Sequence, residues 1–393
     1  MNAQIGAVLC GIGGFGHWYL EHFLDRPDSP IAFKGFVDPA PERSMFLGRI
    51  REAGLPVFPS LEEFYEQSDA ELAILASPIQ FHCPQTLVAL SKGSHVLCEK
   101  PLCGSVVEAR SMCDAARSSG RVVAIGYQDS FLESTQRLKA DILAGVWGRP
   151  LVFKCAALWP RSREYYGRSG WAGRLRDGQG RAVFDSPVNN AAAHFLHHML
   201  YLLGDSVGTS AVPAEVEAQL YRAREIENYD TAFLRCRTTG GAEVFFAVTH
   251  AVGRERGPIF ELAFEKGAVR YELPGGEIAG EHADGRRRSY GPAERSGRAK
   301  VLDTVAAIRE GRAPLCGVEA AMSHTLAVAA AQESGRPVAD FPRELVSEFE
   351  KKGEHWLQVE GLDEVVLESL RSGRLPGPGE APWVRSARAV SVG

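Results

Sequence analysis

Three glycines near the N-terminus have a spacing that suits phosphate chemistry. Residues 8–20 read VLCGIGGFGHWYL, and Gly11, Gly13 and Gly16 follow the order G-x-G-x-x-G. In this arrangement the first glycine allows a tight turn, the second lets the backbone approach a pyrophosphate, and the third allows close packing of helix on strand. The spacing also arises by chance, so its meaning depends on the elements that flank it.

An acidic residue at the end of the next apolar run completes the pattern. A predicted strand precedes the glycines, a helical pattern follows them, and Asp38 ends the run IAFKGFVD. The N-terminus of such a helix offers free N–H groups to phosphate. A carboxylate at Asp38 can accept hydrogen bonds from ribose hydroxyls and repels a 2′-phosphate. The sequence therefore predicts an NAD site that includes Gly14 and Phe15 and disfavours NADP.

The elements that must position these residues alternate between strand and helix over the first 130 residues. This βα alternation predicts a doubly wound parallel sheet of the Rossmann type, which we assign to a domain spanning 1–130. Ligands of such sheets bind beyond the carboxyl ends of the strands. Residues with polar or turn chemistry end five consecutive predicted strands: the glycine turn, Asp38, Ser77-Pro78, Glu99-Lys100-Pro101 and Tyr127-Gln128. We expect Ser77, Pro78, Glu99, Lys100 and Gln128 to face the cofactor.

The pattern changes after about residue 150. One long apolar helix is expected at 189–204, followed by a series of β-like runs between 214 and 273. These runs predict a second, α+β domain over 131–393 with a large, mostly antiparallel open sheet. Two late helical patterns, 297–311 and 318–335, are expected to pack back on the first domain.

Composition restricts the classes of partner. The chain has 393 residues, a net charge of −5 and 45% hydrophobic residues, which suits a cytoplasmic globular protein. No apolar run is long enough to span a membrane, and the N-terminus lacks the basic start of a signal peptide. The densest basic run, GRRRSY at 285–290, is interpreted as a solvated loop, so no nucleic-acid partner is expected.

Four motifs together resemble one family. GIGGFG, SPIQFH, CEKP and the helix that carries His194 and ends at YLLG are similar to the glucose–fructose oxidoreductase / inositol dehydrogenase (Gfo/Idh/MocA) family. The resemblance implies hydride transfer between a nicotinamide and a sugar, polyol or related alcohol. It implies that Lys100 and His194 are active-site residues and that Pro78 and His82 lie near the nicotinamide. It also implies a homodimer or homotetramer formed through the open sheet.

One departure from the family affects the expected proton relay. The family often has an aspartate four residues before the histidine and another three residues after it, where this chain has Asn190 and His197. Alcohol oxidation needs a base for the hydroxyl proton and a positive neighbour for the developing oxyanion. We expect Lys100 to supply the charge and a neutral His194 to act as the base. Asn190, at i−4 on the same predicted helix face, would orient it.

The aromatic and basic stretch WPRSREYYGRSGWAGR is the expected region of substrate specificity. Aromatic rings can stack on the C–H face of a sugar, and arginines offer forked donors to hydroxyls or a carboxylate. Arg161, Tyr166 and Trp171 are the preferred contacts, with His197 as a further candidate. No metal site is expected, because Phe195 stands where a zinc-binding HExxH motif needs its glutamate.

Two other functions remain open at this stage. A lyase or glycosidase could keep its NAD bound and oxidise the sugar only transiently. The protein could also be a non-catalytic NAD-binding sensor, because fold does not fix function. The sugar and the carbon that is oxidised are not specified by the sequence.

Overall fold

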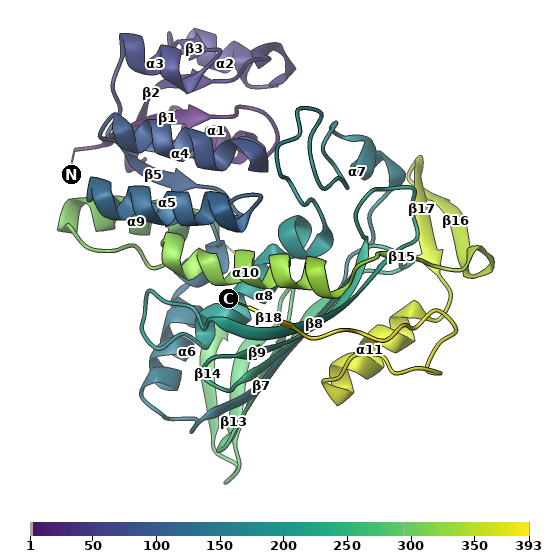
Figure 1. Ribbon diagram of the computed structural model, residues 1–393. Coiled ribbons are helices and arrows are strands. Elements are labelled where there is room, and N and C mark those ends of the chain that lie inside the picture. The colour runs from purple at the N-terminus through teal and green to yellow at the C-terminus, as the bar shows by residue number, and fades with distance from the viewer. Residues whose placement is uncertain (1–2, 294–295, 393) are drawn as a thin grey trace. The chain divides into compact units, whose positions relative to one another are not determined.

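A computed structural model describes residues 3–293 and 296–392 (Figure 1). The chain divides into two compact units, and each is described here by itself. The first unit holds residues up to 131 together with 296–322, and the second holds the remaining described residues. None of the helices in these ranges combines the length and apolarity needed to cross a membrane.

The first unit is built on a six-stranded parallel sheet with the order β3-β2-β1-β4-β5-β6. Its strands are β1 (Ile5–Cys10), β2 (Ile31–Val37), β3 (Val57–Phe58), β4 (Leu72–Leu75), β5 (His95–Cys98) and β6 (Val123–Ile125). Its helices are α1 (Gly16–Phe23), α2 (Leu47–Glu52), α3 (Leu61–Gln67), α4 (His82–Ser91), α5 (Val106–Ser119), α9 (Arg298–Glu310) and the start of α10 (Val318–Ser334). Short 3-10 turns lie at Pro41–Arg43, Ile79–Phe81 and Gln128–Phe131. The predicted Rossmann sheet is confirmed.

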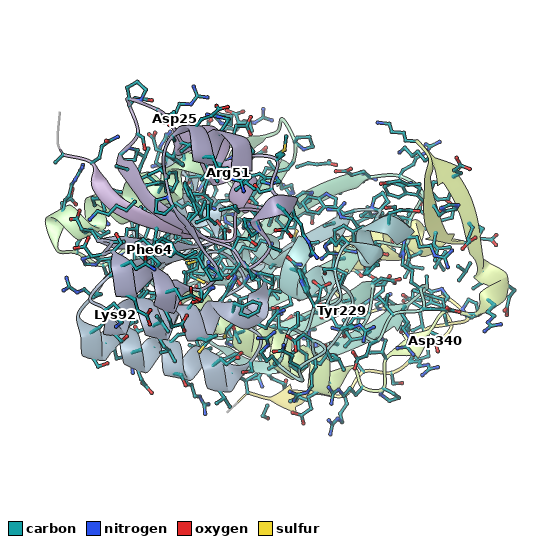
Figure 2. The ribbon with its side chains drawn as sticks, turned by 90° about the horizontal axis from the view of Figure 1, so that it is seen from above. Asp25, Arg51, Phe64, Lys92, Tyr229 and Asp340 are labelled. Atoms are coloured by element: carbon teal, nitrogen blue, oxygen red, sulfur yellow. The ribbon has the colours of Figure 1, made fainter. Side chains whose placement is uncertain are left out.

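Local signals explain several of these elements. Ser60 and Ser105 accept hydrogen bonds from the backbone N–H groups three residues later and thereby begin α3 and α5. Gly120 ends α5 in the left-handed conformation. The ring of Phe64, labelled in Figure 2, packs against Gly35 in β2, where a side chain would collide with it.

The second unit contains a large mixed sheet with the order β14-β13-β12-β11-β7-β10-β9-β8-β15, and β18 pairs with β8. β10 pairs with β7 in parallel, as does β15 with β8, and the other pairings are antiparallel. The sheet strands are β7 (Pro150–Leu158), β8 (Pro213–Arg222), β9 (Thr231–Thr238), β10 (Glu243–Thr249), β11 (Arg256–Phe264), β12 (Gly267–Glu272), β13 (Glu277–His282), β14 (Arg287–Pro292), β15 (Ala339–Asp340) and β18 (Val390–Ser391). The predicted mostly antiparallel sheet is thus confirmed.

The remaining elements of this unit surround the sheet. They are helices α6 (Glu133–Leu143), α7 (Arg163–Gly167), α8 (Ala193–Leu202) and α11 (Leu362–Ser372), a π-helical turn at Pro187–Ala191, a 3-10 turn at Arg343–Leu345, and the hairpin of β16 (Val346–Lys351) and β17 (Glu354–Val359). The basic run at 285–290 is only partly a loop, because Gly285 and Arg286 lie in a turn whereas Arg287 and Arg288 begin the edge strand β14, and Arg288 donates to Asp141 at 2.7 Å.

The two faces of the large sheet are covered by different helices. Along β7, Phe153 and Cys155 belong to the core that also contains Phe195 of α8. The alternate residues Ala156 and Leu158 pack in a second core with α11. Because successive side chains of a strand point to opposite faces, α8 and α11 lie on opposite sides of the sheet. Helix α11 therefore occupies part of the face through which a homo-oligomer was expected, and that assembly stays a prediction.

Candidate functional site

The glycine turn of the first unit joins β1 to α1 with little spare room on one side. Gly11 has φ +84°, and a Cβ atom there would lie 2.8 Å from the carbonyl oxygen of Ala76. A Cβ on Gly16 would lie 1.9 Å from the carbonyl oxygen of Gly11. Above Gly13 and Gly14, by contrast, no atom of the described residues, apart from the neighbours in the chain, lies within 4 Å of a Cβ position. The turn is thus closed where it packs on the protein and open where a ligand would approach.

Asp38 lies at the end of β2, beside this turn. Its Oδ2 accepts a hydrogen bond from the backbone N–H of Ile12 at 3.0 Å, and its Oδ1 accepts one from Ala40 at 2.9 Å. The hydroxyl of Ser44 donates to the carbonyl of Ile12 at 2.6 Å and fixes the turn from the other side. A carboxylate has about four acceptor positions, so Asp38 can hold the turn and still accept from a ribose.

Glu99, expected at the cofactor, uses its carboxylate within the first unit. The side chain is buried, accepts a hydrogen bond from the Tyr19 hydroxyl at 2.7 Å and forms an ion pair with Lys300. Burial lowers the pKa of Lys300, and Glu99 opposes that shift. The Lys300 ammonium also lies 4.6 Å from the ring centroid of Phe15, which is 45% exposed at the glycine turn. The pair thereby ties α9 to the end of β5 and to the turn.

His82 holds the ends of two neighbouring strands together. One ring nitrogen lies 2.8 Å from the carbonyl oxygen of Pro101, and the other lies 2.9 Å from that of Ser77. Burial lowers the pKa of this imidazole. Since Pro101 follows Lys100, His82 helps to fix the backbone from which the half-buried lysine projects. The role of His82 near a nicotinamide stays a prediction.

The other expected cofactor residues also follow the strands of the parallel sheet. The Ser77 hydroxyl donates to Gln85 of α4 at 2.6 Å, and Pro78 precedes the 3-10 turn at Ile79–Phe81. Gln128, half-buried, begins the 3-10 turn after β6. Because the carboxyl ends of parallel strands share one edge of a sheet, Ser77, Lys100 and Gln128 lie at the edge that carries the glycine turn.

The second unit does not contain the continuous helix expected at 189–204. A π-helical turn spans Pro187–Ala191, Ala192 leaves the helical conformation with φ −109° and ψ 15°, and α8 begins at Ala193. Asn190 and His194 therefore lie on separate helical elements and not on one continuous α-helix, and the role of Asn190 in orienting His194 stays a prediction. Within α8, His194 is 9% exposed and His197 is 1% exposed. Burial lowers the pKa of His197 well below its usual value, so this imidazole is neutral.

Asn190 contacts a carboxylate that the sequence analysis missed. Its Nδ2 donates to Oδ1 of the buried Asp185 at 2.7 Å. Oδ2 of Asp185 accepts from the backbone N–H of Gly173 at 2.7 Å and lies 3.5 Å from the Arg168 guanidinium. Asp185 thus links the π-helical turn to the stretch that was expected to determine specificity. Its own backbone carbonyl accepts from Asn228 at 3.0 Å, which fixes the segment further.

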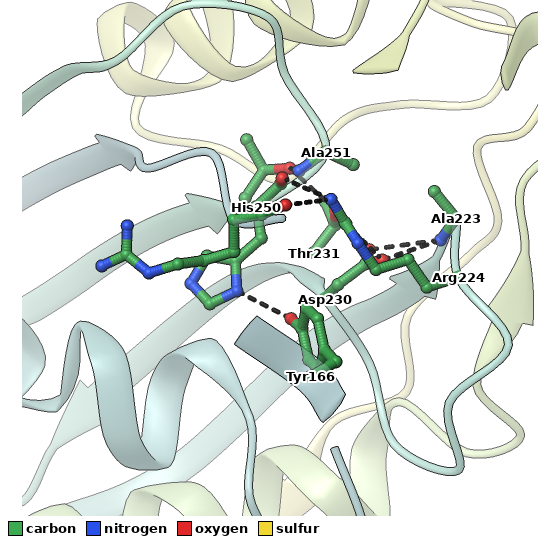
Figure 3. Close-up of polar contacts among 9 residues, drawn as sticks. Tyr166, Ala223, Arg224, Asp230, Thr231, His250 and Ala251 are labelled. Carbon is green, nitrogen blue, oxygen red and sulfur yellow. Dashed lines mark hydrogen bonds and ion pairs between the residues drawn. The ribbon is translucent and has the colours of Figure 1, made fainter. Parts of the chain in front are cut away.

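The predicted specificity residues occupy different environments. Arg161 donates to the carbonyl of Pro160 at 3.0 Å, and its guanidinium lies 5.3 Å from the ring of Trp159. Trp171 is half-buried, with the Arg168 guanidinium 5.0 Å from its ring. Tyr166 is engaged, because its hydroxyl lies 2.7 Å from Nδ1 of His250 (Figure 3).

The ends of the parallel strands β7 and β10 meet in this buried network, shown in Figure 3. Arg224 pairs with the fully buried Asp230 at 3.1 Å and donates to the carbonyls of Arg161 and His250. Burial, with arginines 161, 224 and 168 adding to it, lowers the pKa of His250 well below its usual value. His250 is therefore neutral, and its Nδ1 shares a hydrogen bond with the Tyr166 hydroxyl, which its raised pKa keeps protonated.

Comparison with known proteins agrees with this architecture. Residues 5–127 match the family described as "Oxidoreductase family, NAD-binding Rossmann fold" (GFO_IDH_MocA), and residues 135–270 match "GFO/IDH/MocA C-terminal domain". The chain belongs to the GFO/IDH/MocA family. The expected family and its Rossmann domain are therefore confirmed.

Relatives within the family indicate the range of activities. The chain is 34% identical over 137 residues to D-glucoside 3-dehydrogenase of Escherichia coli, covering 34% of this chain and 36% of that one. It is 37% identical over 210 residues to inositol 2-dehydrogenase 4 of Saccharopolyspora erythraea, covering 53% and 56%. The chain thus spans about a third to just over half of the length of these curated relatives.

A solved structure supports the fold. The WlbA dehydrogenase of Bordetella pertussis, in complex with NADH and UDP-GlcNAcA, superposes with a TM-score of 0.69 at 22% identity. The superposition covers 85% of this chain and 97% of that one.

Proposed function

We propose that this GFO/IDH/MocA protein is an NAD-dependent dehydrogenase that oxidises a secondary alcohol of a sugar, cyclitol or sugar derivative. The observation that carries the proposal is the glycine turn, which is open above Gly13 and Gly14 and lies beside the Asp38 carboxylate. Family membership and the sugar and inositol dehydrogenases among the curated relatives support the substrate class.

The residues of the first unit fit a nicotinamide adenine dinucleotide. The N–H groups at the start of α1 would hold the pyrophosphate, and Asp38 would accept from the adenosine ribose and disfavour a 2′-phosphate. Gly14, Phe15, Ser77 and Gln128 would line the remaining path of the cofactor. When bound, the nicotinamide supplies the acceptor for hydride.

The proton and the charge of the reaction are assigned to protein side chains. Lys100, at the end of β5, would stabilise the negative charge that develops on the substrate oxygen. His194 would accept the hydroxyl proton as a neutral base. Arg161, Tyr166 and Trp171 would contact the substrate ring, and His197 is a further candidate for this contact.

Asp185 gives Asn190 a defined role in this scheme. An ionised carboxylate only accepts hydrogen bonds, so the amide nitrogen of Asn190 must face Asp185 and the amide oxygen must point away. Asn190 is therefore held as an acceptor for a donor on the substrate or on His194. The family often places a carboxylate at position 190. In this chain the buried carboxylate of Asp185 supplies that charge and acts through its hydrogen bond to Asn190.

The test is to mix the purified protein with NAD and a panel of sugars and cyclitols and to follow absorbance of the reduced cofactor. Net NADH formation that is lost in both Lys100→Ala and His194→Ala is expected. Near-normal turnover in both variants would contradict the assignment. Product without net NADH would instead indicate a lyase or glycosidase, and tight NAD binding without any product would indicate a sensor.

A further inference from the structure

The second unit contains a pocket that shares only Tyr166 with the residues assigned above to the dehydrogenase reaction. Its volume is about 780 Å³, which lies within the usual range for ligand sites. Its walls come from α7, from the turn after β8, from the segment after β15 and from the β16–β17 hairpin. The lining side chains include Arg163, Glu225, Arg343, Glu348 and Trp356.

Specific contacts hold these walls in place. His355 of β17 lies 2.9 Å from Oε1 of Glu164 in α7, and its backbone N–H donates to Oε2 of the same carboxylate at 3.2 Å. Arg222 pairs with Asp340, labelled in Figure 2, at 2.6 Å. Arg224, which also lines the pocket, is held by its ion pair with the buried Asp230 (Figure 3). The hollow is therefore part of the fold of this unit and not a gap between loose segments.

The charges that face the pocket have both signs. Two arginines, Arg163 and Arg343, have no ion-pair or hydrogen-bonding partner for their side chains within residues 3–293 and 296–392. Two glutamates, Glu225 and Glu348, are equally unpaired within those ranges. Carboxylates in the wall oppose a simple anion, and arginines oppose a simple cation. The number of charged groups opposes a purely apolar ligand.

A hydroxylated ring satisfies all of these groups at once. Each hydroxyl both donates and accepts, so it can bind a carboxylate and a guanidinium together. The half-buried Trp356 offers an apolar face for the C–H side of such a ring. We propose that this pocket binds a pyranose ring. The inference rests on the proposed function only for the choice of saccharides as ligands.

The position of the pocket in the chain indicates what it adds. The lining residues from Asp340 onward follow residue 270, where the match to the family's C-terminal domain ends. About half of the pocket is therefore built by a segment outside the matched domains. The ring that it holds is either a second unit of a larger glycoside substrate or a separate saccharide with a site of its own.

Binding is tested on the full chain without NAD, by isothermal titration with maltose, cellobiose and methyl α-D-glucopyranoside. At least one probe is expected to bind, and Arg343→Ala and Trp356→Ala are each expected to weaken that binding at least tenfold. Arg51→Ala serves as the matched control, because Arg51 is an exposed arginine of α2 in the other unit (Figure 2). Arg343 has no partner to lose, so its removal leaves the fold intact.

Kinetics then separate the two sources of the ring. A raised KM for the disaccharide alone in Arg343→Ala identifies a second unit of the substrate, whereas lost binding with unchanged KM values identifies a separate saccharide. Failure of all three probes to bind, or binding that both pocket variants leave unchanged, overturns the proposal. If the variants lose binding but no sugar ever yields NADH, the pocket stands and the dehydrogenase proposal fails.

Discussion

Gly13→Ala and Gly16→Ala make the same chemical change three residues apart, and the structure predicts opposite consequences. At Gly16 the new methyl group would lie 1.9 Å from the carbonyl oxygen of Gly11, far inside van der Waals contact. Forcing such an overlap costs about 1–3 kcal/mol or more, because the backbone has to shift. At Gly13 no atom of residues 3–293 and 296–392, apart from the neighbours in the chain, lies within 4 Å of the methyl position, and φ is outside the left-handed region. The stability there should change by no more than about 1 kcal/mol.

Cofactor affinity, in contrast to stability, should be affected directly by Gly13→Ala. A methyl group on Gly13 would stand in the open space that we assign to the pyrophosphate, so NAD should bind at least about tenfold more weakly, or about 1.4 kcal/mol. The assays are urea denaturation without cofactor and calorimetric titration with NAD. Gly48→Ala is the control, since Gly48 lies in α2 with open space around it and away from the turn. A folded Gly13→Ala protein that binds NAD like the wild type would refute the cofactor assignment.

Three further predictions concern buried or paired charges. Lys300→Met should lower the free energy of unfolding by about 3–5 kcal/mol, because it leaves the Glu99 carboxylate buried without its cation. Urea denaturation should show that the double variant with Glu99→Gln recovers part of this loss. Equal stabilities of the single and double variants would contradict the pairing. Asp185→Asn should reduce kcat by about tenfold and leave NAD affinity unchanged, because the Asn190 amide loses its fixed orientation. The effect is smaller than the ~10²–10⁴-fold of a group that itself transfers the proton, because Asp185 acts only through Asn190. An unaltered kcat would argue against this role. Glu164 raises the pKa of His355. The attachment of β17 to α7 should therefore be complete below pH 6.5 and weaken as pH rises through the raised pKa. Hydrogen exchange of β17 should show this pH dependence, and Glu164→Gln should abolish it.

Much of the first unit follows from local sequence. A strand, a glycine turn and a helix were predicted at residues 5–25 because each is specified by neighbouring residues, through periodicity and conformational freedom. The placement of Asp38 beside the turn also followed, since parallel strands end at one edge of a sheet. The serine caps of α3 and α5 belong to the same class of local signal.

The partners of the site residues were decided by tertiary structure. Glu99 and Lys300 are 201 positions apart, and nothing in the sequence near Glu99 indicates that α9 will supply its cation. Asp185 is close to Asn190 in sequence, but their contact depends on the π-helical turn, which a regular helical pattern does not predict. Apolar periodicity determines which face of an element is buried, whereas the identity of the neighbour on that face depends on the packing of distant segments, and this is why the elements could be predicted from the sequence and their polar partners could not.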